Sequence, residues 1–324
     1  MKFQLPALRR ARPLLGAVGL AVVVAFAPSS SRAQETAAPW LRSLNTWRAN
    51  VGLPPITENP EWLQGLREHS NYLVELGAVS HQQDPNRLGA TAEGAKAGGS
   101  SVVIAWNLSA VSTESGAIAE WVRAPFHALH LFEPRWQRSA YGEARQPGRL
   151  PVDGAAALDV LRGVGPKIRM DRPITFPGDA TSVPLTDFTS EVPDPLTSCP
   201  GYAAPTGLPL LALFPDPVTT TSAELRVDGV VVPSCLIDQR YVNPDPAAQD
   251  LARTLLRQKN AVVIVPRFPL LPGSTYEATV VSSAGNLRWS FRVDPAAAPS
   301  AGRPVTISAA RKTTLTAKTA KSSQ

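Results

Sequence analysis

Apolar positions in the first part of the chain repeat at the period of an α-helix. Between residues 36 and 52 they are spaced three and four apart, which places them on one helical face. A second helix is expected after Asn59-Pro60, a capping residue followed by a proline suited to the first turn, and Gly77 is a natural end. A third follows near residue 113 and ends at Pro125. These helices are each expected to dock an apolar face on a core.

From about residue 150 the pattern changes to short apolar runs separated by many prolines. Asp228-Gly229 lies between two such runs and predicts a hairpin turn, as does the SAGN stretch between the last two runs. Strands at this spacing are typical of a β-sandwich. We therefore expect a β-sandwich domain over residues 195–295, joined to the helical part by a linker region with some strand over residues 149–194.

The N-terminus has the pattern of a secretory signal peptide. Basic residues precede an apolar run, and the small-residue site Ser31-Arg32-Ala33 follows. The apolar run is about 14 residues long, short of the roughly 20 that a membrane-spanning helix needs, and no later stretch approaches that length. We expect a secreted, periplasmic or cell-surface protein, exported with cleavage near Ala33 and with no transmembrane segment in the mature chain.

The net charge of +6 comes from the two ends of the chain. Residues 1–33 carry five basic and no acidic residues, and five more basic residues follow Asp294, so removing these ten charges from +6 leaves −4 for the body. The basic pI therefore gives no case for a nucleic-acid-binding face, and no nucleic-acid partner is expected. The tail, residues 296–324, lacks aromatic residues and is expected to be disordered.

Two cysteines, Cys199 and Cys235, are present. In an exported chain a disulfide between them is the default, with two free thiols as the alternative. The sequence contains no P-loop and no G-x-G-x-x-G, G-x-S-x-G or H-E-x-x-H motif. Nucleotide chemistry and the motif-bearing hydrolases are therefore not supported.

The clearest chemical signal is the grouping of all four histidines in the helical half, at His69, His81, His127 and His130. Zinc needs three or four imidazole, carboxylate or thiolate ligands around one point, and sequence spacing cannot prove that these residues meet. His127 and His130 share a face only if the stretch after Pro125 is helical. From the residues alone, structural histidines and a metal or catalytic site both remain open.

The order of several motifs resembles a bacterial CAP domain (SCP domain), the fold of cysteine-rich secretory proteins, antigen 5 and pathogenesis-related proteins. These motifs are LNTWRANVGLPPITENP, LREHSNYLVELGAVSH, TAEGAKAG, AIAEWVRAPFHALHLFEP and YGEAR. The resemblance covers about residues 36–148 and implies an α+β protein whose N-terminal α-β-α sandwich encloses a central cavity. The later segments look like the β-rich extension of some bacterial CAP domains, here taken as an Ig-like β-sandwich.

The resemblance also implies a site. In that family the cavity is often lined by two histidines and two glutamates that can hold zinc. His81 matches the first cavity histidine and His127 the second, so these two are candidate zinc ligands and zinc is the one cofactor suggested. His69 and Glu93 are further candidates for the cavity, each able to supply another ligand. His130 has no clear counterpart and is expected to be support or surface.

The glutamates of the family are missing from this chain. Ser100 or Ser101 stands where one would be, and Ala124 stands at the other. Two histidines alone make a weak zinc site. No catalytic residue is assigned, and the balance leans against an enzyme.

The function that these observations favour is an exported, non-enzymatic binding module. Its histidine-lined cavity would take a lipid, a small amphiphile or an envelope component. Two alternatives remain open. One is a metal-dependent hydrolase of the envelope or extracellular space that uses His81 and His127 as ligands, and the other is a structural or adhesive surface protein in which the β domain carries the binding.

Overall fold

The computed structural model describes residues 37–107, 110–111 and 113–310 of the chain. The expected signal peptide, residues 1–33, lies outside the described residues, as does the tail after residue 310.

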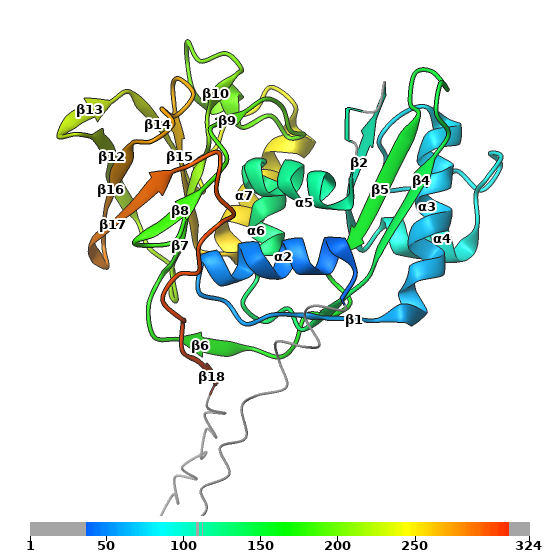
Figure 1. Ribbon diagram of the computed structural model, residues 1–324, viewed down its shortest axis with the longest axis horizontal. Coiled ribbons are helices and arrows are strands. Elements are labelled where there is room, and N and C mark those ends of the chain that lie inside the picture. The colour runs from blue at the N-terminus through cyan, green and yellow to red at the C-terminus, as the bar shows by residue number, and fades with distance from the viewer. Residues whose placement is uncertain (1–36, 108–109, 112, 311–324) are drawn as a thin grey trace, which may run out of the picture. The chain divides into compact units, whose positions relative to one another are not determined.

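The first part of the described chain forms three layers, with helices on both faces of an antiparallel sheet of strand order β2-β5-β4 (Figure 1). The strands are β2 (Ser101–Trp106), β5 (Gly154–Asp159) and β4 (Tyr141–Arg145). One face carries α3 (Leu63–Leu76) and α4 (Ala92–Gly98). The other carries α2 (Pro39–Asn50), α5 (Glu114–Arg123) and α6 (Pro125–Leu131). This arrangement agrees with the expected α-β-α sandwich.

Helix boundaries follow the local chemistry of the sequence. Gly77 ends α3 in the left-handed conformation, with φ of +71°. The Thr113 hydroxyl accepts a hydrogen bond from the Gly116 N–H and so starts α5. Pro125 separates α5 from α6, and Ala124 between them is extended. Because the stretch after Pro125 is helical, His127 and His130 lie three positions apart on one face of α6.

The middle strand of the sheet comes from the range expected to be a linker. All six residues of β5 are buried, and β5 pairs with β2 on one side and β4 on the other. Three of its six residues are alanine and one is glycine, and these small residues allow helices to approach both faces. Gly154 lies against the Trp106 ring, where a Cβ would come within 2.3 Å of ring atoms. The layer therefore extends past residue 148.

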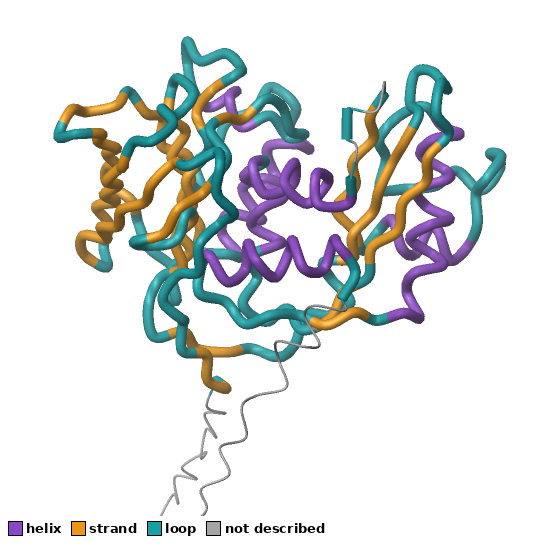
Figure 2. Tube along the Cα trace, in the orientation of Figure 1, coloured by secondary structure: helices purple, strands orange, loops and turns teal. Residues whose placement is uncertain are grey.

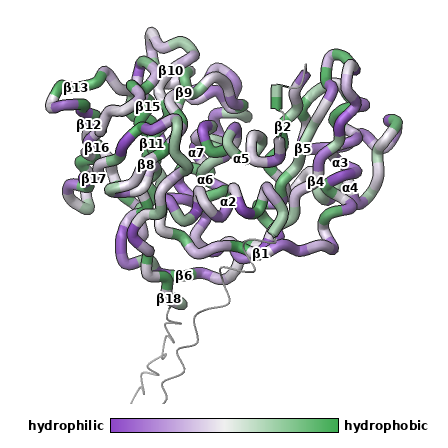
Figure 3. The backbone as a smooth tube through the Cα atoms, viewed as in Figure 1, coloured by the Kyte–Doolittle hydropathy of each residue, from purple (hydrophilic) through white to green (hydrophobic). Residues whose placement is uncertain are grey.

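The second part contains two larger sheets. One has the order β14-β15-β11-β7, with bounds Ser234–Ile237, Ala261–Pro266, Leu210–Leu213 and Ile174–Phe176. The other has the order β13-β12-β16-β17-β8, with bounds Val230–Val232, Thr220–Val227, Thr275–Ser282, Gly285–Val293 and Thr181–Val183. Strand β15 is buried at every residue and hydrophobic through most of its length (Figure 3).

Both hairpins indicated by the sequence are present. Asp228-Gly229 connects β12 to β13, and the turn at residues 283–284 connects β16 to β17. Apolar side chains of both sheets join one buried cluster with those of α2, α5 and α6. The assignment of these sheets to the Ig-like class remains a prediction.

The helix α7 (Pro246–Gln258) was not expected in this part of the chain. Its signals are local: the Asp245 side chain accepts from the Ala247 N–H, and Pro246 occupies the first turn. Figure 2 shows α7 with α5 and α6 in a group of helices between the strands of the two parts.

Short elements complete the fold. Two are 3₁₀ turns, η1 (Pro60–Trp62) and η2 (Pro195–Ser198). The others are three pairs of short strands: β1 (Thr57–Glu58) with β3 (Arg138–Ser139), β9 (Asp187–Phe188) with β10 (Thr206–Gly207), and β6 (Ile168–Met170) with β18 (Ile307–Ala309). Cys199 and Cys235 form the expected disulfide, with an S–S distance of 2.07 Å.

The beginning of the C-terminal tail is ordered, although disorder was expected from residue 296. Strand β18 pairs with β6, and the Val305 N–H donates to the Gly52 carbonyl at 2.8 Å. This segment is ordered because its backbone pairs with β6, and the amino-acid composition of the tail does not reveal such pairing.

The buried side chain of Asn50 joins three segments at the end of α2. Its Nδ2 donates to the Ser300 carbonyl at 2.8 Å and to the Ser182 carbonyl at 3.3 Å, and its Oδ1 accepts from the Gly178 N–H at 3.0 Å. The C-terminal segment and the loop before β8 are thereby held to the helical layer.

Replacing this side chain should destabilise the protein. We expect Asn50→Ala to lower the free energy of unfolding by about 2–4 kcal/mol, because the buried Gly178 N–H loses its acceptor and the links to Ser182 and Ser300 are removed. Urea denaturation followed by tryptophan fluorescence measures this change. The control is Asn86→Ala, which removes an exposed asparagine. Equal stability of the two variants would contradict the role of Asn50.

Candidate functional site

A pocket of about 260 Å³ lies where α6 meets β2, the turn after β5, α7 and the segment at residues 192–193. Most of its lining is apolar, and its polar side chains are three histidines and one serine. The lining residues are His81, Gly99, Ser101, Val102, Phe126, His127, His130, Val160, Leu161, Val192, Pro193, Leu251, Ala252 and Leu255.

His127 is held by a carboxylate that comes from far along the chain. Oε1 of Glu191 accepts from both the backbone N–H of His127 at 2.7 Å and its ring Nδ1 at 2.5 Å. Oε2 accepts from the Phe126 N–H at 3.0 Å. The Glu191 side chain is completely buried. It therefore caps the N-terminus of α6, for which Ala124 provides no side-chain hydrogen bond.

This contact also assigns the tautomer of His127. An ionised carboxylate can only accept hydrogen bonds, so Nδ1 of His127 must carry the proton. In the neutral ring, Nε2 is then an acceptor. No hydrogen bond of Nε2 to another described residue is present, and the ring lines the pocket.

His130 lies on the same face of α6 and is kept neutral. Its Nδ1 is buried and has no hydrogen-bond partner within the described part of the chain. Burial, followed by the positive charge of Lys259, lowers the pKa of His130 to about 3. The expectation that His130 would be support or surface differs from its place in the pocket lining.

The other two histidines have different surroundings. His81 is exposed and borders the pocket, with Nδ1 at 3.4 Å from the Gly98 carbonyl. His69 is buried and lies outside the lining: its Nε2 contacts the Ser80 carbonyl at 2.9 Å and its Nδ1 contacts Gln83 Nε2 at 3.2 Å. Both ring nitrogens of His69 are occupied, which indicates a structural role in place of the expected cavity role.

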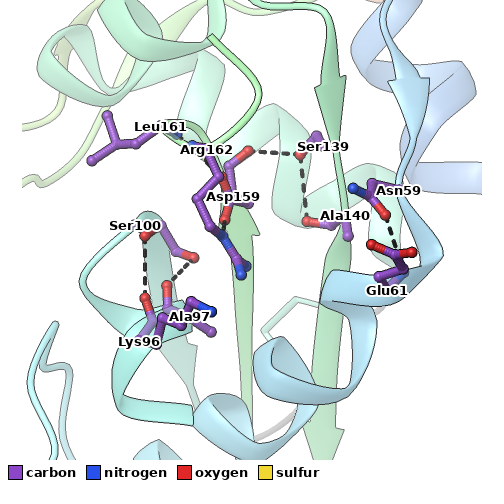
Figure 4. Close-up of polar contacts among 11 residues, drawn as sticks. Asn59, Glu61, Lys96, Ala97, Ser100, Ser139, Ala140, Asp159, Leu161 and Arg162 are labelled. Atoms are coloured by element: carbon purple, nitrogen blue, oxygen red, sulfur yellow. Dashed lines mark hydrogen bonds and ion pairs between the residues drawn. The ribbon is translucent and has the colours of Figure 1, made fainter. Parts of the chain in front are cut away.

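Glu93 is exposed in the first turn of α4 and does not line the pocket. The serines near the expected carboxylate position are also occupied. Ser100 and Ser101 donate their hydroxyl hydrogens to the carbonyls of Lys96 and Ala97, at 3.1 and 2.6 Å, and so cover the end of α4 (Figure 4). Neither serine hydroxyl therefore takes over the role that a carboxylate would have as a ligand in the pocket.

The turn after β5 is fixed by the buried carboxylate of Asp159 (Figure 4). Its Oδ1 accepts from the backbone N–H groups of Leu161 and Arg162, at 3.2 and 2.9 Å, and its Oδ2 pairs with the Arg162 guanidinium. Burial raises the pKa of Asp159, against the lowering effect of Arg162. The turn brings Val160 and Leu161 to the pocket.

Part of the chain that forms this site matches a known protein family. Residues 41–149 match the family model of the cysteine-rich secretory protein family, CAP. The chain carries a CAP domain. A comparison with curated proteins gave no match. The pocket joins parts of the CAP domain to residues outside the matched range, among them those of α7. Glu191, which also lies outside that range, holds His127 from behind.

The donor atoms around this pocket do not fit a tightly held zinc ion. Structural and catalytic zinc sites use three or four protein ligands. Across the described residues, no three His, Cys, Asp or Glu side chains gather in a way that could hold a metal. The oxygens of Glu191 are already used by α6 and His127. His81 and His127 therefore remain an incomplete ligand set.

Glu191 is the main residue that the sequence did not reveal. It lies in the proline-rich range taken as a linker, 64 positions from His127. No local motif marks it, because its partners are backbone N–H groups and a ring nitrogen of a distant helix.

We expect Glu191→Ala to lower the free energy of unfolding by about 2–4 kcal/mol, because the start of α6 and the His127 ring lose their acceptor. The matched control is Glu93→Ala, which should change stability by less than about 0.5 kcal/mol since Glu93 is exposed. Urea titrations of both variants provide the measurement. A larger loss of stability in Glu93→Ala than in Glu191→Ala would contradict the role assigned to Glu191.

Zinc should not stabilise the protein. A ligand that binds the folded state raises the melting temperature by mass action, so a tight site would be visible in a thermal scan. We expect the melting temperature to be the same with added zinc and with chelator, and metal analysis of protein purified without chelator to find substoichiometric zinc. Stoichiometric zinc that is lost in His81→Ala or His127→Ala would contradict this expectation and would show that these histidines bind zinc.

Proposed function

We propose that this protein is an exported, non-enzymatic binding module whose pocket takes a lipid or another small amphiphile. The observation that carries the proposal is the distribution of polarity around the pocket. Imidazoles from α6, His81 and the Ser101 hydroxyl supply its polar groups, and apolar side chains from α6 and from four other segments supply the rest. Binding sites of this kind combine an apolar lining with a few polar groups that fix orientation.

The rim of the pocket supports the same ligand class. Three lining residues are large, apolar and strongly exposed: Leu161 at 49%, Leu251 at 62% and Val192 at 87%. They come from the turn after β5, from α7 and from the segment next to Glu191. Exposed apolar residues that border one pocket favour an apolar ligand that continues beyond it. At about 260 Å³, the pocket would enclose one end of such a ligand.

A catalytic role has less support. The Glu191–His127 pair has the arrangement of a general base and the carboxylate that orients it. The only hydroxyl side chain of the lining, Ser101, is directed to the Ala97 carbonyl at 2.6 Å and is not paired with His127. The zinc ligand set is incomplete as well. A hydrolase would therefore lack both an activated nucleophile and a metal-bound water.

Export is supported by the disulfide and by the N-terminal sequence pattern. Disulfides persist in oxidising compartments, and Cys199–Cys235 connects η2 to β14. Among the described residues, none of the helices has the length and apolar character needed to cross a membrane.

Binding of an alkyl fluorophore tests the proposal on the folded protein. We expect saturable binding with enhanced emission, and about tenfold weaker binding in Leu251→Ser, because the ligand loses apolar contact on α7. The control is Val231→Ser, which changes a half-exposed apolar residue of β13 outside the pocket. Absence of saturable binding, or equal effects of both substitutions, would contradict the proposal.

A further inference from the structure

We propose that a second cleft of the protein, about 360 Å³ in volume, binds a phosphate group in its dianionic form. This cleft lies where the chain after α6, strand β6, the end of β11 and the chain at the end of α7 meet. It shares no lining residue with the pocket that carries the proposed function, so the two sites can be tested separately.

The lining of this cleft has an excess of positive charge. Four of its side chains are cationic and two are acidic: Arg135, Lys167, Arg169 and Lys259 against Glu133 and Asp216. Between its two basic ends the chain has a net negative charge, so this group of cations differs from the rest of the body. A cleft in which one sign of charge predominates attracts ions of the opposite sign.

At the centre of the group is a carboxylate whose hydrogen-bonding capacity is used up. Oε1 of Glu133 accepts from the backbone N–H and Nε of Arg135, at 3.0 and 2.7 Å. Oε2 accepts from Nη2 of Arg135 at 3.0 Å and also from Nζ of Lys259. A carboxylate has about four lone-pair sites, and these four bonds fill them. Because Arg135 and Lys259 bind the same oxygen, their charged groups are close neighbours.

Both cations keep donors that this carboxylate does not satisfy. An ammonium has three N–H donors, and Glu133 is the one hydrogen-bond partner of Lys259 Nζ among the described residues. Nη1 of Arg135 has no hydrogen bond to any described residue. The Lys259 side chain is only 11% exposed, so its remaining donors have little access to water. Since a nearly buried cation without enough acceptors is costly, an anion in the cleft would stabilise it.

The single charge of Glu133 does not balance the cations around it. Arg48, which is fully buried, donates to the Glu133 carbonyl at 3.1 Å and adds a third positive charge to Arg135 and Lys259. Burial lowers the pKa of Lys259, Glu133 opposes this effect, and the charge of Arg135 lowers the pKa further. Arg135 and Lys259 therefore repel each other, and an anion that contacts both would relieve this repulsion.

A phosphate group suits this arrangement better than a carboxylate does. Three cations around one carboxylate leave an excess of two positive charges, which a dianion can balance and a monoanion cannot. A phosphate also has several acceptor oxygens, and guanidinium and ammonium groups are its usual partners in proteins. The phosphate may belong to a soluble ester or to a lipid headgroup, since both present the same chemistry to the cleft.

The test compares glycerol 3-phosphate with glycerate, a carboxylate of similar size, by calorimetric titration of the full protein at low ionic strength and pH 8. At this pH the phosphate ester carries two charges and glycerate carries one. We expect saturable binding of glycerol 3-phosphate, about tenfold tighter than that of glycerate. Equal affinities, or no binding of glycerol 3-phosphate, would overturn the inference. The proposed function would still stand, because the alkyl fluorophore binds at the other pocket.

Substitutions that change the charge of the cleft should shift the affinity in opposite directions. Lys259→Gln removes a cation and should weaken glycerol 3-phosphate binding about tenfold. Asp216→Asn removes an exposed carboxylate of the lining and should tighten binding about two- to threefold. Its matched control is Asp250→Asn, which changes an exposed aspartate of α7 outside the lining and should leave the affinity unchanged.

The Asp216 pair keeps the inference testable if Lys259→Gln does not fold, since Asp216 and Asp250 are both exposed and neither forms an ion pair with a described residue. Equal affinities of Asp216→Asn and Asp250→Asn for glycerol 3-phosphate would contradict the assignment of the anion to this cleft. So would unchanged binding in a folded Lys259→Gln variant.

Vesicles distinguish the two sources of the phosphate group. Phosphatidylcholine vesicles with and without phosphatidic acid present or withhold a phosphate monoester at a membrane surface. Sedimentation of the protein only with the phosphatidic acid vesicles, reversed by glycerol 3-phosphate, would identify a lipid headgroup. Glycerol 3-phosphate binding without sedimentation would identify a soluble phosphate ester. Absence of both would overturn the inference.

Discussion

The carboxylate of Glu191 at the start of α6 is the contact on which the site depends. A completely buried carboxylate is stable only when its oxygens are hydrogen-bonded, and here two backbone N–H groups and the His127 ring meet this need. The contact sets the His127 tautomer and also places Val192 and Pro193, the next two residues, in the pocket wall. One interaction thus orients the polar part of the pocket and closes its apolar part.

A second buried charge cluster holds the opposite end of α6. Arg48 is fully buried and donates to the carbonyls of Leu131 and Glu133, at 2.7 and 3.1 Å. Burial lowers the pKa of Arg48 to about 9, although Glu133 raises it. The Glu133 carboxylate binds Arg135 and also Lys259 at the end of α7. Burial acts to raise the pKa of Glu133, but the hydrogen bonds and positive charges of Arg135 and Lys259 outweigh it. The pKa of Glu133 is therefore lowered to about 2. Helix α7, which forms one pocket wall, is therefore anchored to the CAP domain through α6.

Local patterns in the sequence predicted the elements that depend on local chemistry. The stop at Gly77, the helix break at Pro125 and both hairpins follow from residues within a few positions of each turn. The CAP resemblance directed attention to His127, which lines the pocket. Strand β5 escaped notice because its buried alanines show no alternation, although it is the middle strand of the sheet. Glu191 could not be found from sequence, since a lone glutamate in a proline-rich stretch has no periodic or motif signal.

The central claim is that the Glu191 carboxylate and the His127 ring stabilise each other across the boundary of the CAP domain. A double-mutant cycle of Glu191→Ala and His127→Ala, with unfolding free energies from urea denaturation, isolates this side-chain contact. The backbone hydrogen bonds to Glu191 cancel in the cycle, because they are kept in His127→Ala and lost in both Glu191→Ala and the double variant. The account predicts a coupling free energy of about 1–3 kcal/mol, as expected for a buried, charge-assisted hydrogen bond. Additive effects, within about 0.5 kcal/mol, would contradict it.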